Sequence, residues 1–406
     1  MKNILKISLF SIIFLIACAE KKTEIKLEAI GDTSIHVFEN ENLHFNMAFK
    51  ENITEDENGM LRLDAGRVLV KKVKLPKYQL QPEVTVHLKL TSNGDPWDKS
   101  GSMFIIPKTS NLTLIDFETG KFDLKTIKQT YPVITSYQKD SILHEPNVEL
   151  LRFMTPFGVG HFTNDERVKA RKPVYIPKWE DEVNWSQNIT HLLPLLEDEV
   201  YVGIYIDTWT KEGYNITATL DFKESTIPNH TKKQQTVIPL VNTSKYASGQ
   251  KLYDEFSRSD VNVEFEMPAT FNNAKLYYIT TGHGGHSGGD EFVKKENKIS
   301  LDGNTLKSFI PWRDDCASFR RFNPTSATWK ANQFYDDVDD CEKIASSDLS
   351  RSNWCPGSDI QPEIIPLKNI SQGKHTITIS IPEAQEAKQG EDNYWMVSAY
   401  IVYDNE

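Results

Sequence analysis

The chain has little of several things, and each shortage excludes a class of protein. Its formal net charge is −11 over 406 residues, so it lacks the basic surface that binding to nucleic acid requires. After residue 22 it has no hydrophobic run near the roughly 18 residues of a membrane span. It has four cysteines, and the last three, Cys316, Cys341 and Cys355, match no common zinc-binding spacing. Three is an odd number, so one thiol is free or pairs outside the chain.

The first 22 residues have the pattern of an export signal. Lys2 and Lys6 precede a largely apolar run from Ile7 to Ala17, which is too short to span a bilayer and is typical of a secretory signal. The run ends in Leu15-Ile16-Ala17-Cys18, which resembles the bacterial lipoprotein box, where the cysteine is acylated. We therefore expect an exported bacterial lipoprotein, anchored through Cys18 in the cell envelope on the periplasmic or surface face of the outer membrane. The alternative is an ordinary signal peptide with an incidental cysteine.

Alternation of apolar and polar residues dominates the rest of the chain and predicts β-strands. The clearest alternating runs are rich in Val, Ile, Thr and Tyr and cover residues 84–90, 200–209, 215–222, 274–281, 375–382 and 394–403. Asp302-Gly303 between two further runs predicts a hairpin. A short helix is expected only over residues 185–196. This pattern indicates an all-β chain with two cores, arranged as antiparallel sandwiches or jelly rolls.

A polar segment with Pro228, residues 224–235, separates two β-patterned halves. We expect an N-terminal domain over residues 23–225, a linker over 226–235 and a C-terminal domain over 236–406. Residues 108–149 are long for a connection between neighbouring strands, so we interpret them as an insertion with a hairpin around residues 118–120.

Three segments that pair an aromatic ring with a carboxylate suggest a site for sugars. They are Trp97-Asp98, Asp207-Thr208-Trp209 and Asp290-Glu291-Phe292, and each lies at or just after the end of a predicted strand or apolar run. Aromatic rings stack on the apolar faces of sugars, and carboxylates bind hydroxyl groups or transfer protons. Arg351 in Arg351–Gly357 adds a cation that binds a carboxylate or polarises a carbonyl oxygen.

Each of these signals also has a simpler interpretation. Asp98 follows Asn-Gly-Asp-Pro, which is strong turn chemistry. Asp207 is explained equally well as a solvent-facing residue at a strand end, and Arg351 as half of a surface salt bridge. His283 and His286 stand in a glycine-rich loop without a third ligand, so we expect no metal site there. The loop lacks the ending of a phosphate cradle, and the chain has no Gly-X-Ser-X-Gly motif.

At these residues the chain resembles the bacterial peptide-N-glycosidase F family. The resemblance is clearest in residues 279–282, 309–312 and 351–357, is thinner in residues 97–98, 152–157 and 207–209, and covers most of residues 84–403 outside the insertion. It implies two eight-stranded antiparallel jelly rolls packed side by side, with the site at their junction. It also implies hydrolysis of the amide between asparagine and the innermost N-acetylglucosamine of an N-glycan, without a metal or other cofactor.

Carried over residue by residue, the resemblance assigns roles to individual side chains. Asp98 falls on the primary catalytic aspartate, Glu291 on the glutamate of the second domain and Asp207 on the third acid. The implied substrate contacts are Trp97, Lys99, Trp209, Arg351, Trp354 and His283. A disulfide between Cys316 and Cys355 is implied as well, which leaves Cys341 unpaired.

The chain departs from the family pattern at several of these positions. Asp207 stands where the family usually has a glutamate, Lys99 where it has an arginine and His283 where it has a tryptophan. Cysteines that flank the first and third acidic segments in the best-known member are absent, so other contacts must hold those loops.

We therefore expect a monomeric peptide-N4-(N-acetyl-β-glucosaminyl)asparagine amidase that acts on N-glycosylated peptides and proteins. The alternative is a non-catalytic glycan-binding envelope lipoprotein of the same fold. A copper mono-oxygenase would need clustered histidines, whereas the ten histidines here are scattered. A glycoside hydrolase with paired carboxylates fits the acids but not the segment 351–357.

Overall fold

The computed structural model describes residues 31–51, 53–78, 80–121, 134–170, 172–225, 234–246, 254–284, 289–326, 345–388 and 391–405, and the backbone of residues 329–330 and 333–334. The expected signal segment with Cys18, residues 226–233 of the expected linker, His286 and Cys341 lie outside this range. Among the described helices, none is both long and apolar enough to cross a membrane.

The first half of the chain builds two sheets. One sheet has the order β1 (Thr33–Leu43), β11 (Tyr214–Lys223), β4 (Glu83–Ser92) and β9 (Val183–Asn188). The other has the order β19 (Asp359–Ile360), β8 (Val148–Met154), β5 (Ser100–Ile106), β10 (Glu199–Ile206), β3 (Val68–Lys74) and β2 (Met60–Leu63). All neighbours pair antiparallel, and β19 comes from the second half of the chain, so it ties the two halves together.

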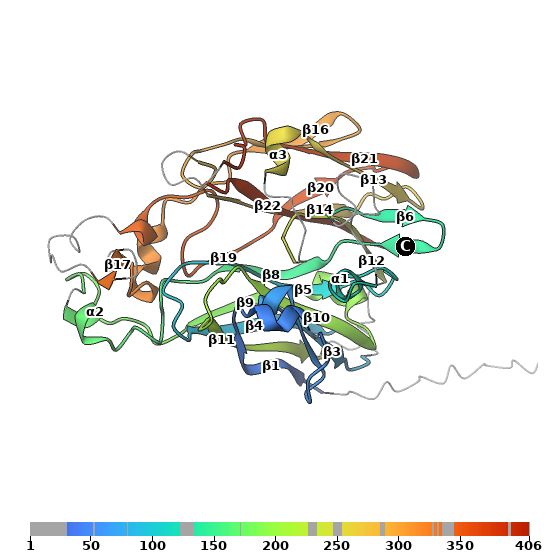
Figure 1. Ribbon diagram of the computed structural model, residues 1–406. Coiled ribbons are helices and arrows are strands. Elements are labelled where there is room, and N and C mark those ends of the chain that lie inside the picture. Colours follow the sequence, from blue (N-terminus) through green and yellow to red (C-terminus); the bar gives the residue numbers. More distant parts are fainter. Residues whose placement is uncertain are drawn as a thin grey trace, which may run out of the picture.

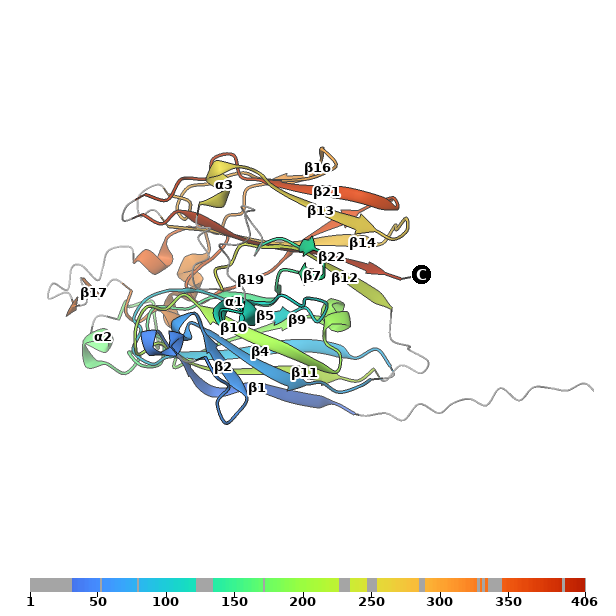
Figure 2. The same cartoon turned by 45° about the vertical axis from the view of Figure 1, so that its right-hand side comes forward.

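The second half builds two further antiparallel sheets. One has the order β12 (Gln235–Asn242), β22 (Tyr394–Asp404), β14 (Ala274–His283) and β20 (Glu363–Leu367). The other has the order β13 (Val261–Met267), β21 (Gly373–Ser380), β15 (Asn297–Leu301) and β16 (Asn304–Phe309). The four sheets lie one above another, with the first half below and the second half above in the views of Figures 1 and 2.

Short elements fill the connections. They are η1 (Met47–Lys50), η2 (Asp64–Gly66), α1 (Leu114–Glu118), β6 (Tyr137–Lys139), β7 (Ile142–His144), α2 (Glu166–Ala170), η4 (Thr190–Leu195), α3 (Glu255–Arg258), η5 (Cys316–Phe322), β17 (Trp329–Lys330), β18 (Gln333–Phe334) and η7 (Ser346–Asp348).

Burial along the strands follows from this stacking. In the outer strands β4, β11, β13 and β21, buried residues alternate with partly or fully exposed ones, because one face meets a core and the other meets water. Every residue of β5 and β8 is buried, because one face packs in the first core and the other lies against residues 112–117 and the second half. Strand β22 is buried almost throughout for the same reason.

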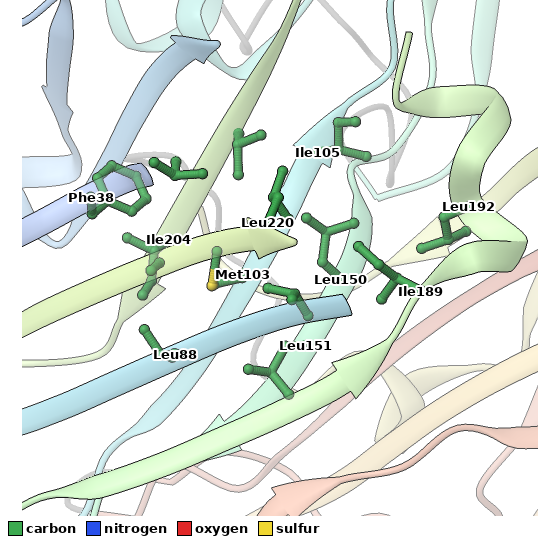
Figure 3. Packing of buried hydrophobic residues seen from close by; sticks show 14 of the residues in the cluster. Phe38, Leu88, Met103, Ile105, Leu150, Leu151, Ile189, Leu192, Ile204 and Leu220 are labelled. Carbon is green, nitrogen blue, oxygen red and sulfur yellow. The ribbon is translucent and has the colours of Figure 1, made fainter. Parts of the chain in front are cut away.

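Each half has its own hydrophobic core. In the first core, side chains of β1, β4 and β11 meet those of β5, β8 and β10, as Figure 3 shows for residues such as Phe38, Leu220, Met103 and Leu151. The second core gathers residues of β13, β14, β21 and β22. The expectation of an all-β chain with two antiparallel sandwich domains is confirmed.

Each of the six alternating runs contains a strand, although residues 207–209 and 381–382 lie beyond the ends of β10 and β21. Asp302-Gly303 is the turn of the β15–β16 hairpin, with positive φ at both residues. The helix expected over residues 185–196 was wrong in its first part, because residues 185–188 belong to β9 and only η4 follows. The hairpin expected around residues 118–120 was also wrong. Residue Glu118 ends α1, which begins with a capping box of Thr113 and Asp116, and the hairpin in the described part of the insertion is β6–β7.

A buried ion pair lies where the two halves meet. Arg152 on β8 pairs with Glu149, Nε to Oε2 at 2.9 Å and Nη2 to Oε1 at 2.5 Å, and both side chains are fully buried. Its Nη1 donates to Thr281 Oγ1 at 3.1 Å and to the carbonyl of Met396 at 2.8 Å, on β14 and β22. One guanidinium of the first half therefore satisfies polar groups of the second half.

Candidate active site

Sheet pairing brings the first and third acidic segments together. Asp98 lies between β4 and β5, and Asp207 directly follows β10. Because β10 pairs with β5, the backbone N–H of Asp207 donates to the carbonyl of Ser100 at 3.0 Å. Two carboxylates that are 109 positions apart in the sequence (207 − 98) are therefore carried by adjacent strands.

Asp95 holds the two loops against each other. It is fully buried and accepts hydrogen bonds from Thr208 Oγ1 at 2.7 Å, from Thr210 Oγ1 at 3.2 Å and from the backbone N–H of Trp97 at 3.0 Å. Tyr214 adds a hydroxyl that donates to the carbonyl of Trp97 at 2.6 Å. These bonds fix the geometry of the two loops without a disulfide.

The second half contributes Glu291 and Arg351. Glu291 follows the glycine-rich loop after β14, and its backbone N–H donates to the carbonyl of Gly284 at 3.2 Å. Arg351 Nε donates to Glu291 Oε1 at 2.7 Å, and Arg351 Nη2 lies 3.7 Å from Asp98 Oδ2. One guanidinium thus faces an acid from each half of the molecule.

Arg351 itself is rigidly supported. Its side chain is 1% exposed and lies over the rings of Trp354, at 4.6 Å, and Phe292, at 5.0 Å. Its Nη1 donates to the carbonyl of Leu349 at 3.0 Å, and its Nη2 donates to Ser346 Oγ at 3.1 Å. A planar guanidinium that contacts two rings and is bonded at all three nitrogens presents its charge in a fixed direction.

Burial shifts the ionisation of both first-half acids. Burial raises the pKa of Asp98 to about 6, with Glu291 acting in the same direction and Arg351 and Lys99 opposing it. Burial also raises the pKa of Asp207, against the lowering effect of the neighbouring cations, Arg67 first and then Lys99. A carboxyl group that titrates near neutral pH suits general acid–base catalysis.

The six expected substrate contacts divide into three groups. Trp209 is 51% exposed, its Nε1 donates to Asp207 Oδ1 at 3.2 Å, and its ring offers a surface for a sugar. Trp97 and Lys99 are partly buried in the loop of Asp98. Arg351, Trp354 and His283 are buried, at 1%, 2% and 4% exposure.

Trp354 and His283 are buried and pack against each other. Trp354 donates from Nε1 to the carbonyl of Gly282 at 2.8 Å, and His283 stacks between Trp354 and Tyr394. Burial lowers the pKa of His283 to about 3, so the ring is neutral, and it shares a 2.8 Å hydrogen bond with Thr281 Oγ1. Trp354 therefore supports Arg351 directly, and His283 packs against Trp354.

The Cys316–Cys355 disulfide is present, with the two Cα atoms 5.1 Å apart. It joins the start of η5 to the residue after Trp354. In the described part of the chain, no three His, Cys, Asp or Glu side chains gather as a metal site would require.

Sequence reasoning missed two residues that shape the site. Asp95 lies in a sequence typical of a turn, and Arg67 lies in no recognisable motif, although its Nη1 is 3.1 Å from Asp207 Oδ1. Asp95 bonds to a residue 113 positions away and Arg67 to one 140 positions away, so no local pattern connects them to the site.

Comparison with known proteins gives a consistent result. Two family models match: "Peptide-N-glycosidase F, N terminal" over residues 34–222 and "Peptide-N-glycosidase F, C terminal" over residues 251–402. A solved structure of PNGF-II is 33% identical with a TM-score of 0.76, and the match covers 92% of this chain and 65% of that one. The chain thus spans less than two thirds of PNGF-II. No curated protein sequence matches.

Two structures of PNGase F are similar in fold. Recombinant PNGase F is 15% identical with a TM-score of 0.59, and the match covers 92% of this chain and 96% of that one. PNGase F described as a glycosylasparaginase from Flavobacterium meningosepticum is 14% identical with a TM-score of 0.57 and the same coverage.

Proposed function

Because the chain belongs to the peptide-N-glycosidase F family, we propose that it hydrolyses the amide between asparagine and the innermost N-acetylglucosamine of N-glycoproteins. The observation that carries this proposal is the meeting of Asp98 and Glu291, from opposite halves, at the buried Arg351. Hydrolysis of an amide bond needs a base to activate water and a fixed positive charge to stabilise the developing negative charge, and this arrangement supplies both.

In the proposed reaction, Asp98 accepts a proton from a water molecule while the oxygen of that water forms a bond to the amide carbon. The C–N bond then breaks as Asp98 returns this proton to the nitrogen, which leaves as a glycosylamine. The peptide keeps an aspartate, and the glycosylamine later loses ammonia to water. A general base in this position contributes a rate factor of roughly 10²–10⁴.

The other side chains position substrate and charge. Arg351, held by Glu291 and the Trp354 ring, places a fixed positive charge beside Asp98, where negative charge develops on the amide oxygen. Asp207 and the exposed ring of Trp209 bind the sugar next to the bond. No covalent intermediate is needed.

We also propose that the chain works as a monomer tethered to the bacterial envelope through a lipid on Cys18. The support is the Leu-Ile-Ala-Cys sequence at residues 15–18. Globomycin treatment of expressing cells should leave an unprocessed precursor if Cys18 is lipidated, and a Cys18→Ser protein should appear in the soluble fraction.

The test of the activity is the mass of the peptide product. Purified protein is incubated with a defined N-glycopeptide, and the expected peptide carries aspartate in place of asparagine, a gain of about one dalton over the unmodified sequence that follows from hydrolysis of the amide. A peptide that retains one N-acetylglucosamine would show a glycosidase instead. An unchanged glycopeptide that the protein retains on a column would favour the non-catalytic glycan-binding alternative.

A further inference from the structure

Arg67 contacts two residues of the site at once. Its side chain is 4% exposed, its Nη1 lies 3.1 Å from Asp207 Oδ1, and its guanidinium carbon lies 4.1 Å from the ring centre of Trp209. Because Trp209 Nε1 donates to the same carboxylate oxygen, at 3.2 Å, the three side chains form one cluster. Phe45 packs on the Trp209 ring, with centroids 5.2 Å apart, and closes the cluster on another side.

A second carboxylate fixes the guanidinium from behind. Arg67 Nη2 lies 2.5 Å from Asp64 Oδ2, and Asp64 is 1% exposed. A buried guanidinium that is paired on two edges has little freedom to rotate. Arg67 therefore has one orientation, which points Nη1 at Asp207.

The backbone that delivers Arg67 has an unusual shape. Asp64, Ala65 and Gly66 have φ of 45°, 55° and 87°, three consecutive residues in the left-handed region. Non-glycine residues there are held only where the surroundings enforce the conformation, and such places cluster at functional sites. At Gly66 a Cβ atom would lie 2.4 Å from the carbonyl oxygen of His44, so no other residue fits without a shift of backbone.

The insertion helps to hold residues 64–66 in this left-handed conformation. Glu118 is the last residue of α1, and its Oε2 accepts a hydrogen bond from the backbone N–H of Asp64 at 2.6 Å. Leu114 and Phe117 of α1 pack in one cluster with Leu63, next to the turn. The insertion therefore buttresses the turn that precedes Arg67.

We propose that Arg67 is a positioning residue that holds Asp207 and Trp209 in the orientation in which they bind the sugar, and that α1 keeps Arg67 in place through Glu118. This inference rests on the proposed function, since it concerns the sugar-binding side of the same site. It also explains how Asp207, one methylene shorter than a glutamate, serves at this position. Arg67 and the Trp209 indole hold its carboxylate at a fixed point.

The test compares Arg67→Met with a matched control in the same hairpin. Arg62 on β2 also lies over an aromatic ring, that of Phe49, and pairs with a carboxylate, that of Glu41, but is not bonded to Asp207. With a glycopeptide substrate, Arg67→Met should raise KM about tenfold or more with a smaller change in kcat, as the loss of a hydrogen bond to a charged group predicts. Arg62→Met should leave KM unchanged, and Arg67→Lys should recover part of the loss.

A double-mutant cycle separates positioning from general damage. In the Asp207→Ala background, Arg67→Met should cost less glycopeptide affinity than it does in wild type, because the carboxylate that Arg67 pairs with is gone and only its contact with Trp209 remains. An equal loss of affinity in both backgrounds, or no loss in wild type, would overturn the inference. If Arg67→Met does not fold, Glu118→Ala is measured instead and should weaken binding, while Glu118→Gln, which keeps the acceptor, should not.

Affinity is measured by fluorescence titration with the glycopeptide as well as by kinetics. A wild-type protein that binds but does not cleave would refute the proposed function and leave the cycle readable. If the wild type cleaves the glycopeptide and Arg67→Met has the same KM and affinity as the wild type, only the role of Arg67 is refuted.

Discussion

At Asp98, burial and neighbouring charges act in opposite directions on one carboxyl group. Burial and the charge of Glu291 raise its pKa, while Arg351 and Lys99 lower it, and the balance falls at about 6. Arg351 does not simply neutralise the acid, because its Nε is committed to Glu291 and its Nη2 lies 3.7 Å from Asp98. The carboxyl group therefore remains a base strong enough to take a proton from water near neutral pH.

The first prediction concerns the pH dependence of the reaction. Only the carboxylate form of Asp98 can accept a proton, so kcat/KM should fall as the pH decreases through about 6 and level off above it. Lys99→Met removes a charge that lowers this pKa, so the acid limb should move to higher pH. The profile is measured on one glycopeptide for both proteins. A flat profile through this range, or a shift to lower pH in Lys99→Met, would contradict the role of Asp98.

Among the elements, the segment 351–357 combines three tasks within a few residues. Arg351 carries the charge of the site, Trp354 supports it from below, and Cys355 closes a disulfide with Cys316 over a sequence separation of 39. Arg351 lies outside the described helices and strands, and its backbone pairs with Arg313 in an isolated bridge. The Cys316–Cys355 disulfide therefore holds this segment in place where no regular secondary structure does.

We predict that replacing both Cys316 and Cys355 by serine lowers the free energy of unfolding by about 2–4 kcal/mol, as loop closure at this separation implies. Urea titration followed by tryptophan fluorescence measures the change. Cys341→Ser serves as the control, because it leaves the bridge intact, and it should unfold like wild type. If the double variant and the control unfold alike, the bridge does not stabilise this segment.

In the molecule as a whole, the site depends on the alignment of the two halves. The buried pair of Arg152 and Glu149 lies at their junction, and Thr281, which accepts from Arg152, is bonded to His283 behind Trp354. Contacts thus connect the junction to Trp354, the ring on which Arg351 lies. Because Asp98 and Glu291 come from different halves, a shift of one half against the other should affect turnover more than binding.

Glu149→Ala should be strongly destabilising, by about 3–5 kcal/mol, because it leaves the charge of Arg152 buried without a partner. Glu166→Ala is the matched control: that carboxylate is 87% exposed, pairs with Lys169, and should change stability by less than about 1 kcal/mol. Chemical denaturation measures both. Equal stability of the two variants would mean that the junction pair is not what holds the halves together.

The outer strands were predictable because water on one face imposes alternation, as in β4 and β11. Strands β5 and β8, buried on both faces, carry no such signal, and the helix expected over residues 185–196 failed where β9 pairs with β4. The acidic segments were visible because each has an aromatic neighbour. Asp95 and Arg67 were not, since their partners are distant in the sequence, and the burial of Trp354 and His283 depends on packing that no local pattern encodes.

The most direct measurement is the rate at which wild type and Asp98→Asn convert a glycopeptide to the aspartate product, with glycopeptide affinity measured in parallel. The substitution removes the base but keeps the shape, so the rate should fall by about 10²–10⁴-fold while affinity stays within about threefold. Wild-type protein that binds the glycopeptide without converting it, or two proteins that convert it equally fast, would show that the acids gathered around Arg351 do not perform amide hydrolysis.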